Sequence, residues 1–357
     1  MTVAEGPRRT AGVPAPTPPK SLREFVDKSG LRSLVIGVSK DPNAKLTILL
    51  VQPGSGRPTL VVKAATTDHA ARAIEAEMDI LQGLRQLHPC RVLPTVPRVV
   101  DLLELDGRPA MVTTAIAGAP MSTSYLRWHH TSSHDRVAAD FAAASAWLAE
   151  FQSDTAAEPA PLDLGAGVAG RLRERFAGDD RLGADLSRLD RIHERLRANL
   201  VRRSAVHGDF WFGNLLTTGG RLSGVVDWEA GARVGEPVRD LVRFAVMYAL
   251  YLDRRTRPGR RVRGHRQLRA DEWGAGVEYA LDREGWFPDL FRRFLCHGLS
   301  RLGAAPECWR DAALAGIAEV AAVTDDPEFS RRHLDLFRRL PELPQDERSP
   351  ACLGSAT

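Results

Sequence analysis

The chain has 357 residues, of which 43% are hydrophobic and 26% are charged. This composition is typical of a globular protein and excludes a wholly disordered chain, a collagen-like repeat and a small disulfide scaffold. The length predicts about two domains, or one two-lobed unit with tails. The net charge of +4 gives no overall field that would require a nucleic acid or a membrane as partner.

The two ends of the chain carry no pattern of a folded element. Residues 1–20 contain five prolines and no apolar stretch of the kind that a signal peptide needs, so we expect a disordered tail there. Residues 344–357 lack periodicity and are expected to form a flexible tail. No window approaches about 18 uncharged apolar residues, so we expect no transmembrane helix and no membrane partner.

Four cysteines are scattered along the chain. They form no C-x-x-C pair and no cluster with histidines, which predicts neither a zinc site nor a disulfide framework. Free cysteines are typical of a reducing compartment, so we expect a cytoplasmic protein.

Strand patterns dominate the first part of the chain, residues 21–117. Short apolar runs separated by turn residues predict strands over 33–38, 45–51, 59–63, 96–105 and 109–116. One helical period interrupts them over 68–87. Together these patterns predict a small lobe with an antiparallel sheet and one main helix.

Helical patterns dominate residues 118–343. Apolar residues recur at helical spacing over 135–152, 169–199, 241–252, 287–302 and 311–323. The longest of these ranges is interrupted near Gly178. The sequence therefore predicts an α+β protein with two lobes, of which the second is larger and mostly helical.

Three polar side chains are predicted to meet at one end of a hairpin in the helical part. Gly219 and Gly220 allow the positive φ angles of a two-residue turn, and counting back from that turn places Asn214 opposite Val225. Asp227 lies two residues further along the partner strand, and Asp209 precedes Asn214 by five residues. A carboxamide and two carboxylates thus converge.

Phosphoryl transfer requires this set of groups. Mg²⁺ prefers hard oxygen ligands, and a separate carboxylate must orient the attacking hydroxyl group. Asn214 and Asp227 could hold the metal, while Asp209 could accept the proton of the hydroxyl group.

The pattern His207-Gly208-Asp209-x4-Asn214, followed by Asp227-x-Glu229, resembles the aminoglycoside phosphotransferase and choline kinase family of protein-kinase-like small-molecule kinases. The resemblance covers about residues 30–330. It implies a bilobal protein-kinase-like fold, with a nucleotide-binding N-lobe over 21–117 and a catalytic and acceptor-binding C-lobe over 118–343. It also implies transfer of the γ-phosphoryl group of ATP, with Mg²⁺, to a hydroxyl group of a small molecule such as an antibiotic, an amino alcohol or a sugar-like metabolite.

Roles for individual residues follow from the same resemblance. Asp209 matches the catalytic aspartate, and Asn214 and Asp227 match the two metal ligands. His207 and Asp240, the latter in a P-x-x-D-L segment, match residues that support the catalytic loop.

The family also expects a lysine on the third strand of the N-lobe, in contact with nucleotide phosphates and oriented by a helix glutamate. Lys63 fits that place. The chain has 49 basic residues, of which only five are lysines and the rest are arginines. Glu77 is the predicted glutamate, with Glu75 as the rival because the phase of the helix is not fixed to within one residue.

Other nucleotide contacts are less defined by the pattern. The adenine-binding linker is expected at 113–116, with Thr114 and Ile116 as contacts. The loop after Gly37 has no G-x-G-x-x-G pattern, so Ser39 or backbone amides must contact the phosphates. Lys40 and Lys45 are interpreted as solvated turn residues that could touch phosphate.

An arginine-rich stretch gives the only hint about the acceptor. Residues 254–269 contain eight arginines and no acidic residue, which disfavours a polycationic aminoglycoside. The stretch fits a flexible, solvated insertion, or a contact with an anionic acceptor or acidic partner. It lacks the interleaved aromatic residues of a nucleic-acid site, so nucleic acid is not the expected partner.

Two other functions are compatible with parts of the pattern. A catalytically silent nucleotide-binding regulatory protein would share the fold but usually lacks the lysine or one of the site acids. A metal-dependent hydrolase built on His207, Asp209 and Asp227 would need further histidine ligands. The acceptor, the choice between ATP and GTP, and the oligomeric state are left open by the sequence.

Overall fold

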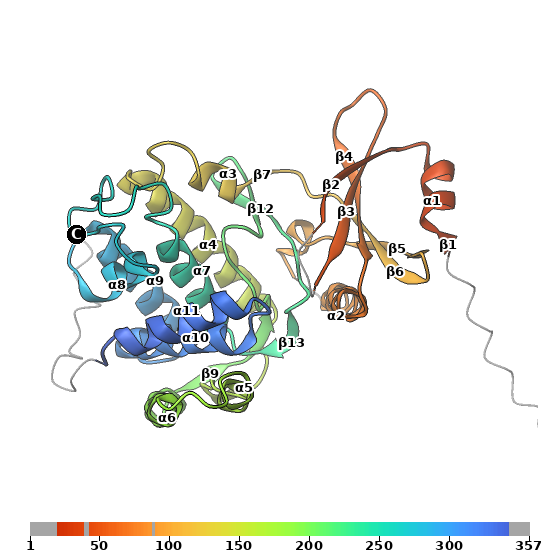
Figure 1. The fold of residues 1–357 in the computed structure, drawn as a ribbon. Coiled ribbons are helices and arrows are strands. Elements are labelled where there is room, and N and C mark those ends of the chain that lie inside the picture. The colour runs from red at the N-terminus through yellow and green to blue at the C-terminus, as the bar shows by residue number, and fades with distance from the viewer. Residues whose placement is uncertain (1–19, 39–42, 88–89, 343–357) are drawn as a thin grey trace, which may run out of the picture.

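Two lobes make up the structure, a small one built on a β-sheet and a larger one built from helices (Figure 1). We describe a computed structural model in residues 20–38, 43–87 and 90–342. The tails predicted at 1–20 and 344–357 lie outside these ranges, apart from Lys20. The predicted α+β class and two-lobed arrangement are confirmed.

The small lobe contains a six-stranded sheet in the order β1-β5-β6-β4-β3-β2. Its strands are β1 (Lys20–Ser21), β2 (Arg32–Val38), β3 (Lys45–Val51), β4 (Pro58–Ala65), β5 (Val99–Leu105) and β6 (Arg108–Thr114). Neighbouring strands are antiparallel, except that β1 runs parallel to β5. The predicted antiparallel sheet thus gains one short parallel strand at its edge.

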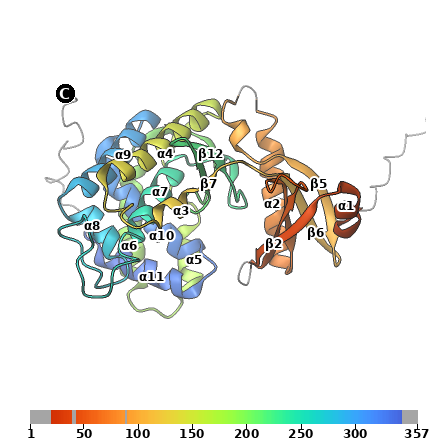
Figure 2. The same ribbon diagram turned by 90° about the horizontal axis from the view of Figure 1, so that it is seen from above.

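Two helices pack on this sheet, α1 (Leu22–Ser29) against β5 and α2 (Asp68–Leu84) against β4 and β6 (Figure 2). Helix α2 buries Ile74 and Leu81 on the side that faces the sheet. Glu77 lies between them at helical spacing and is therefore buried as well. The phase of helix α2 therefore places the Glu77 carboxylate inside the small lobe.

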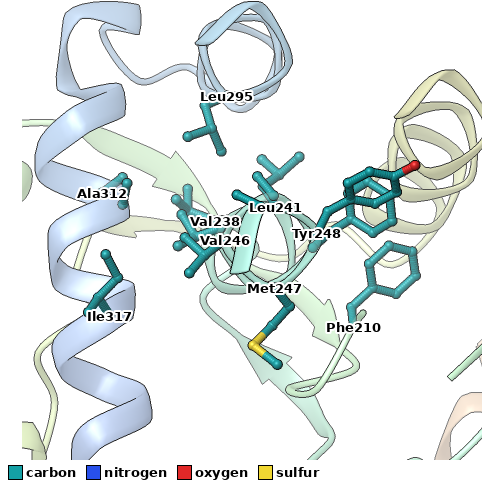
Figure 3. Close-up of a cluster of buried hydrophobic side chains, with 14 of the residues drawn as sticks. Phe210, Val238, Leu241, Val246, Met247, Tyr248, Leu295, Ala312 and Ile317 are labelled. Carbon is teal, nitrogen blue, oxygen red and sulfur yellow. The ribbon is translucent and has the colours of Figure 1, made fainter. Parts of the chain in front are cut away.

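The large lobe is a bundle of helices around α7 (Val238–Leu250). The other helices are α3 (Met121–Tyr125), α4 (His134–Asp154), α5 (Val168–Arg175), α6 (Leu182–Arg197), α8 (Ala275–Asp282), α9 (Trp286–Leu302), α10 (Trp309–Val323) and α11 (Pro327–Arg339). Two 3₁₀ turns are η1 (Leu93–Thr95) and η2 (Pro306–Cys308). Figure 3 shows Leu241 and Val246 of α7 among apolar side chains such as Leu295 and Ile317, which come from α9 and α10.

Short strands join the helices of the large lobe. They are β7 (Ala119–Pro120), β8 (Pro159–Pro161), β9 (Leu200–Arg202), β10 (Ser204–Val206), β11 (Leu215–Thr218), β12 (Arg221–Val225) and β13 (Ala232–Gly235). β11 pairs with β12 as a hairpin and with β7, while β10 pairs with β13 and β8 pairs with β9. The predicted hairpin is thus present and lies against the segment that enters the large lobe.

The register of this hairpin differs from the prediction by one residue. Val225 is paired with Leu215, not with Asn214. A bulge causes the shift, because Leu216 pairs with Gly224 whereas Thr217 pairs with Leu222, which leaves one extra residue on β12.

The helix predicted over 169–199 is in fact two helices, α5 and α6, with Gly178 at a φ of 90° between them. Four helices were not predicted, namely α1, α3, α8 and α11. Helix α11 follows a clear start signal, because the Asp326 carboxylate accepts the N–H groups of residues 328 and 329 ahead of Pro327.

The cysteines depart in part from the expectation. Cys90 and Cys308 are free, but Cys296 is disulfide-bonded, which the scattered spacing did not predict. Within the described ranges, no helix is both long and apolar enough to cross a bilayer.

The packing of α10 against α7 depends on a glycine. A Cβ atom at Gly316 would lie 2.2 Å from Cγ1 of Val242, whereas a Cβ atom at Gly170 in α5 would meet nothing within 4 Å. We expect Gly316→Ala to lower the free energy of unfolding by about 1–3 kcal/mol, because the two helices must move apart. Gly170→Ala is the matched control and should raise it by about 0.4–1 kcal/mol. Denaturant unfolding of both variants checks this, and equal effects would contradict the packing argument.

Candidate active site

The loop that carries His207 and Asp209 is fixed by one buried carboxylate. Asp240, in the first turn of α7, accepts the backbone N–H of His207 at 2.7 Å and that of Gly208 at 2.8 Å. Burial raises the pKa of Asp240, and the two N–H donors together with His207 oppose this shift. Helix α7 therefore holds the loop through its N-terminal turn.

Gly208 is required at its position by conformation and by space. Its φ of 80° is unfavourable for other residues, and a Cβ atom there would lie 2.0 Å from the carbonyl oxygen of Ala230. The loop can therefore pass close to the segment that follows Asp227 only because residue 208 has no side chain.

His207 has a single tautomer that satisfies its neighbours. Its Nδ1 atom accepts the backbone N–H of Asp209 at 3.2 Å, so Nδ1 carries no proton. Its Nε2 atom then donates to the carbonyl oxygen of Val226 at 3.0 Å. The fully buried ring thus links the Asp209 loop to the residue before Asp227.

The Asp209 carboxylate is held from two sides. Nδ2 of Asn214 donates to its Oδ2 atom at 3.1 Å and to its backbone oxygen at 3.0 Å. Nε of Arg243 lies 3.6 Å from its Oδ1 atom. The Asp209 side chain is 39% exposed, so the group is oriented and still accessible to a hydroxyl group.

Arg243 was not among the predicted site residues. It follows Asp240 by three positions on α7 and therefore lies on the same helix face. That spacing is the signal in the sequence that could have identified it.

Lys63 lies between two carboxylates from different parts of the chain. Its Nζ atom lies 2.7 Å from both oxygens of Glu77 and 2.8 Å from Oδ1 of Asp227. The structure places Glu77, and not the exposed Glu75, beside this lysine. Burial would lower the pKa of Lys63, but Asp227 and Glu77 outweigh it and the pKa is raised.

Asp227 combines an unusual backbone with a stabilised charge. Its φ of 71° is rare for a residue with a side chain and is a kind of strain that gathers at functional sites. Lys63 lowers the pKa of Asp227 to about 2, against the effect of burial and with help from Lys45. The carboxylate is therefore ionised at neutral pH.

Asn214 and Asp227 suit a magnesium ion chemically. The Asn214 amide nitrogen faces Asp209, which leaves its side-chain oxygen as the ligand atom. The backbone carbonyl oxygen of Asn214 accepts the N–H of Val226 at 3.0 Å, so the two candidate ligands lie on adjoining parts of the hairpin. Oxygens of Glu77, Asp227 and Glu229 come within 4.8 Å of one another, which adds negative charge at the same place. These oxygen donors fit the preference of Mg²⁺.

The interpretation of Lys45 as a solvated turn residue is wrong. Lys45 begins β3, its side chain is 8% exposed, and it forms an ion pair with Glu229. Asn43 also donates to Glu229, at 2.8 Å. The lysine is buried because β3 turns its first residue toward the large lobe, where Glu229 supplies the opposite charge.

The predicted nucleotide contacts lie in different settings. Ser39 and Lys40 are outside the described residues. Thr114 ends β6, and its N–H donates to the carbonyl oxygen of Arg98 at 2.9 Å, so its amide is occupied within the small lobe. Ile116 follows in the connection between the lobes, close to Gly224 of the hairpin.

A cavity of about 600 Å³, which we call the acceptor cavity, opens beside Asp209. One face of α7 lines it through Arg243, Met247 and Tyr251, which are spaced four residues apart. Arg239 also lines it and lies 2.7 Å from Glu319. The lining of the cavity is thus mixed: besides apolar side chains it contains three arginines and four acidic residues, among them Asp209 and Asp325.

The family of the chain is decided by a match over residues 44–279 to the model of the phosphotransferase enzyme family, APH. The chain belongs to this phosphotransferase family. The match spans Lys63, Glu77, Asp209 and Asp227. No curated protein sequence matches the chain.

Solved phosphotransferases have the same fold. The chain is similar to aminoglycoside phosphotransferase APH(4)-Ia, with 14% identity, a TM-score of 0.54, and coverage of 90% of this chain and 98% of that one. A thermostable mutant (D198A) of the same enzyme, solved with ADP and hygromycin B, has 12% identity, a TM-score of 0.55, and coverage of 89% and 96%. The predicted protein-kinase-like fold is confirmed.

The hydrogen bonds to Asp240 predict that a substitution of this residue destabilises the phosphotransferase. Asp240→Asn keeps the shape but turns an N–H₂ group toward one of two buried N–H donors, so we expect the free energy of unfolding to fall by about 1–3 kcal/mol. Asp135, also in the first turn of a helix but with a 97% exposed side chain, provides the control Asp135→Asn. Thermal and denaturant unfolding measure the difference, and an unchanged Asp240→Asn variant would show that the clamp is unimportant.

The lowered pKa of Asp227 predicts a pH dependence. The unfolded carboxyl group takes up a proton near pH 3.9, whereas the folded one does so only near pH 2. The stabilisation from Asp227 is therefore fully present above about pH 4 and is lost as the pH falls through about 2.

Unfolding of the wild type and of Asp227→Asn across pH 2–7 measures this window. We expect the difference between the two proteins to shrink below about pH 4. Asp190→Asn, at an exposed position of α6, is the control and should follow the wild type at every pH. A constant difference for Asp227→Asn would contradict the charge pairing with Lys63.

Proposed function

We propose that this phosphotransferase moves the γ-phosphoryl group of ATP to a hydroxyl group of a small molecule. The observation that carries the proposal is the meeting of Lys63 from the small lobe with Asp227 of the large lobe, next to the oriented carboxylate of Asp209. A phosphate-binding cation, a metal-binding group and a proton acceptor are the parts that phosphoryl transfer needs.

Each residue takes a distinct part in the reaction. Lys63, oriented by Glu77, binds the phosphates of ATP. Asp209 accepts the proton as the hydroxyl oxygen forms its bond to the γ-phosphorus, and the bond to the bridging oxygen breaks to release ADP. Mg²⁺ held by Asn214 and Asp227 would neutralise charge on the phosphates. His207 and Asp240 position the loop.

The two lobes would bind different substrates. The N-lobe, residues 21–117, would bind the nucleotide, with the linker at Thr114 and Ile116 and the loop at Ser39 as its further contacts. The C-lobe, residues 118–343, would bind the acceptor in the acceptor cavity. A cytoplasmic location fits the use of ATP.

The direct test is ADP release with Mg·ATP across a panel of aminoglycosides, macrolides, amino alcohols, sugars and sugar acids. On an accepted substrate, we expect Asp209→Asn to lower kcat about 10²–10⁴-fold, which is the usual effect of a positioned general base. Asp135→Asn is the exposed control and should retain the wild-type rate. Equal rates for Asp209→Asn and the wild type would refute the role of Asp209.

A second measurement separates the alternatives. If nothing in the panel is phosphorylated but ATP raises the melting temperature, the protein is a nucleotide-binding regulator of the same fold. If ATP does not change the melting temperature, the proposed nucleotide site is refuted. Tightly bound zinc in metal analysis would favour the hydrolase instead.

The lysine gives an independent test of the nucleotide site. Lys63→Met should raise the KM for ATP and lower kcat, because the cation that contacts the phosphates is gone. Lys28 in α1 is 73% exposed and forms an ion pair with Glu24 of the same helix, so Lys28→Met is the matched control and should leave both constants unchanged.

A further inference from the structure

The backbone of the arginine-rich stretch, residues 254–269, has a defined fold, while all eight of its arginine side chains are exposed to solvent as expected. It folds back on itself, with hydrogen bonds of 2.9 Å from the N–H of Val262 to the oxygen of Leu268 and from the N–H of Ala270 to the oxygen of Arg260. Val262, His265 and Leu268 are buried beneath it. The stretch is therefore a folded loop, which we call the arginine loop.

The arginine loop packs against the segment after α3. Nε2 of His265 donates to the carbonyl oxygen of Thr131 at 2.8 Å. Gly264, at a φ of 82°, comes so close to Ser132 that a Cβ atom would lie 2.7 Å from its backbone. The two segments thus hold each other in a defined position.

A cavity of about 110 Å³, which we call the arginine pocket, lies between these two segments. Its lining includes four arginines and one histidine and contains no aspartate or glutamate; the basic residues are Arg127, His129, Arg254, Arg255 and Arg263. None of the four arginines forms an ion pair within the described part of the chain. The volume suits a carboxylate or phosphate group, since a water molecule occupies roughly 30 Å³ of liquid.

His129 in the arginine pocket lies beside a guanidinium group. Nη1 of Arg263 lies 3.2 Å from Nε2 of His129, and because a guanidinium group can only donate, the histidine must accept and be neutral. Burial, Arg263 and Arg136 all lower the pKa of His129. His129 also has a φ of 65°, a conformation that marks strain in a residue with a side chain.

Asp253, the acidic residue next to Arg254 in the chain, does not pair with the arginines of the pocket. Asp253 precedes Arg254, but within the described chain it forms no ion pair with the arginines, and burial raises its pKa. The guanidinium group of Arg254 instead lies 5.3 Å from the centre of the Tyr251 ring. The pocket therefore keeps an uncompensated positive charge.

Tyr251 is a wall shared by the arginine pocket and the acceptor cavity. Its ring centre lies 6.1 Å from that of Trp211, two residues after Asp209. Burial raises the pKa of Tyr251, Arg254 opposes that shift, and Asp209 adds to it, so this one side chain is in the field of both sites. The two cavities therefore adjoin at this side chain.

We propose that the acceptor of this phosphotransferase is a hydroxylated small molecule with an anionic group, a carboxylate or a phosphate, which the arginine pocket binds. The assignment rests on the proposed function and adds the class of its substrate. Guanidinium groups recognise carboxylates and phosphates through paired hydrogen bonds, and here four of them surround a space of the right size.

The first test measures anion binding without any turnover. Inorganic phosphate is titrated into the full chain by calorimetry, with Mg·ADP present at saturation so that the nucleotide site is filled. We expect saturable binding that becomes at least tenfold weaker in the double variant Arg255→Gln/Arg263→Gln. The matched control, Arg257→Gln/Arg266→Gln, removes the same charge from the same loop outside the pocket and should stay within twofold of the wild type.

Two results of this titration would overturn the proposal. One is the absence of saturable phosphate binding by the wild type. The other is an equal loss in both double variants, which would indicate that the net charge of the arginine loop attracts anions without a built site, as contact with an acidic macromolecule would require.

The second test compares acceptors in pairs that differ in one anionic group. Glucuronate and glucose 6-phosphate are compared with glucose, and uridine 5′-monophosphate with uridine, by ADP release. We expect a higher kcat/KM for the anionic member and a loss of that preference in Arg255→Gln/Arg263→Gln with the KM for ATP unchanged. The carboxylate and phosphate members show which anion is preferred.

The outcomes distinguish this proposal from the proposed kinase function on which it rests. Phosphorylation of acceptors without any charge preference would refute the anionic class while the kinase function stands. Phosphate binding at the arginine pocket without phosphorylation of any acceptor would refute the kinase function while the anion site stands.

Discussion

A cation between two carboxylates joins the two lobes at the candidate active site. Glu77 is almost wholly buried on α2, and a buried carboxylate is tolerated only when it is paired and hydrogen-bonded. Lys63 supplies the charge, and the backbone N–H of Trp228 donates to the same group at 3.2 Å. Because Lys63 also contacts Asp227, the small-lobe sheet, helix α2 and the end of the hairpin are held together at one point. Loss of the lysine would leave two carboxylates facing each other.

Helix α7 extends this arrangement through the large lobe. Its first turn holds the catalytic loop through Asp240, its next turn brings Arg243 to Asp209, and its last turn ends at Tyr251 between the two cavities. Apolar neighbours surround the helix on most sides, as Figure 3 shows for Val246 and Leu241. One rigid element therefore lies beside Asp209, the acceptor cavity and the arginine pocket.

The sequence predicted those strands and turns whose signals lie within a few neighbouring residues. The strand that carries Lys63 and the hairpin after Asp209 were recognised because their spacing and turn residues are local. The bulge in β12 was missed because it depends on how the hairpin packs, and a shift of one residue has no signature in the Gly219-Gly220 turn. The burial of Lys45 was missed because Glu229, its partner, lies far along the chain. Composition alone could not indicate that the arginine loop is folded, since its buried centre consists of three scattered residues.

The distribution of charge around the acceptor cavity explains why the arginine pocket would dominate the choice of substrate. Three of the four acidic groups at the cavity have basic neighbours, since Glu319 pairs with Arg239, Glu229 with Lys45, and Asp209 lies beside Arg243. The fourth, Asp325, lies 3.5 Å from His69. Paired charges contribute little to the field beyond their own contact. The unpaired guanidinium groups contribute more, but salt screens exposed charges over about 8 Å at physiological ionic strength. Only a group that enters the pocket would therefore gain from them, so the proposed enzyme would select the position of an anionic group on the acceptor and not its net charge alone.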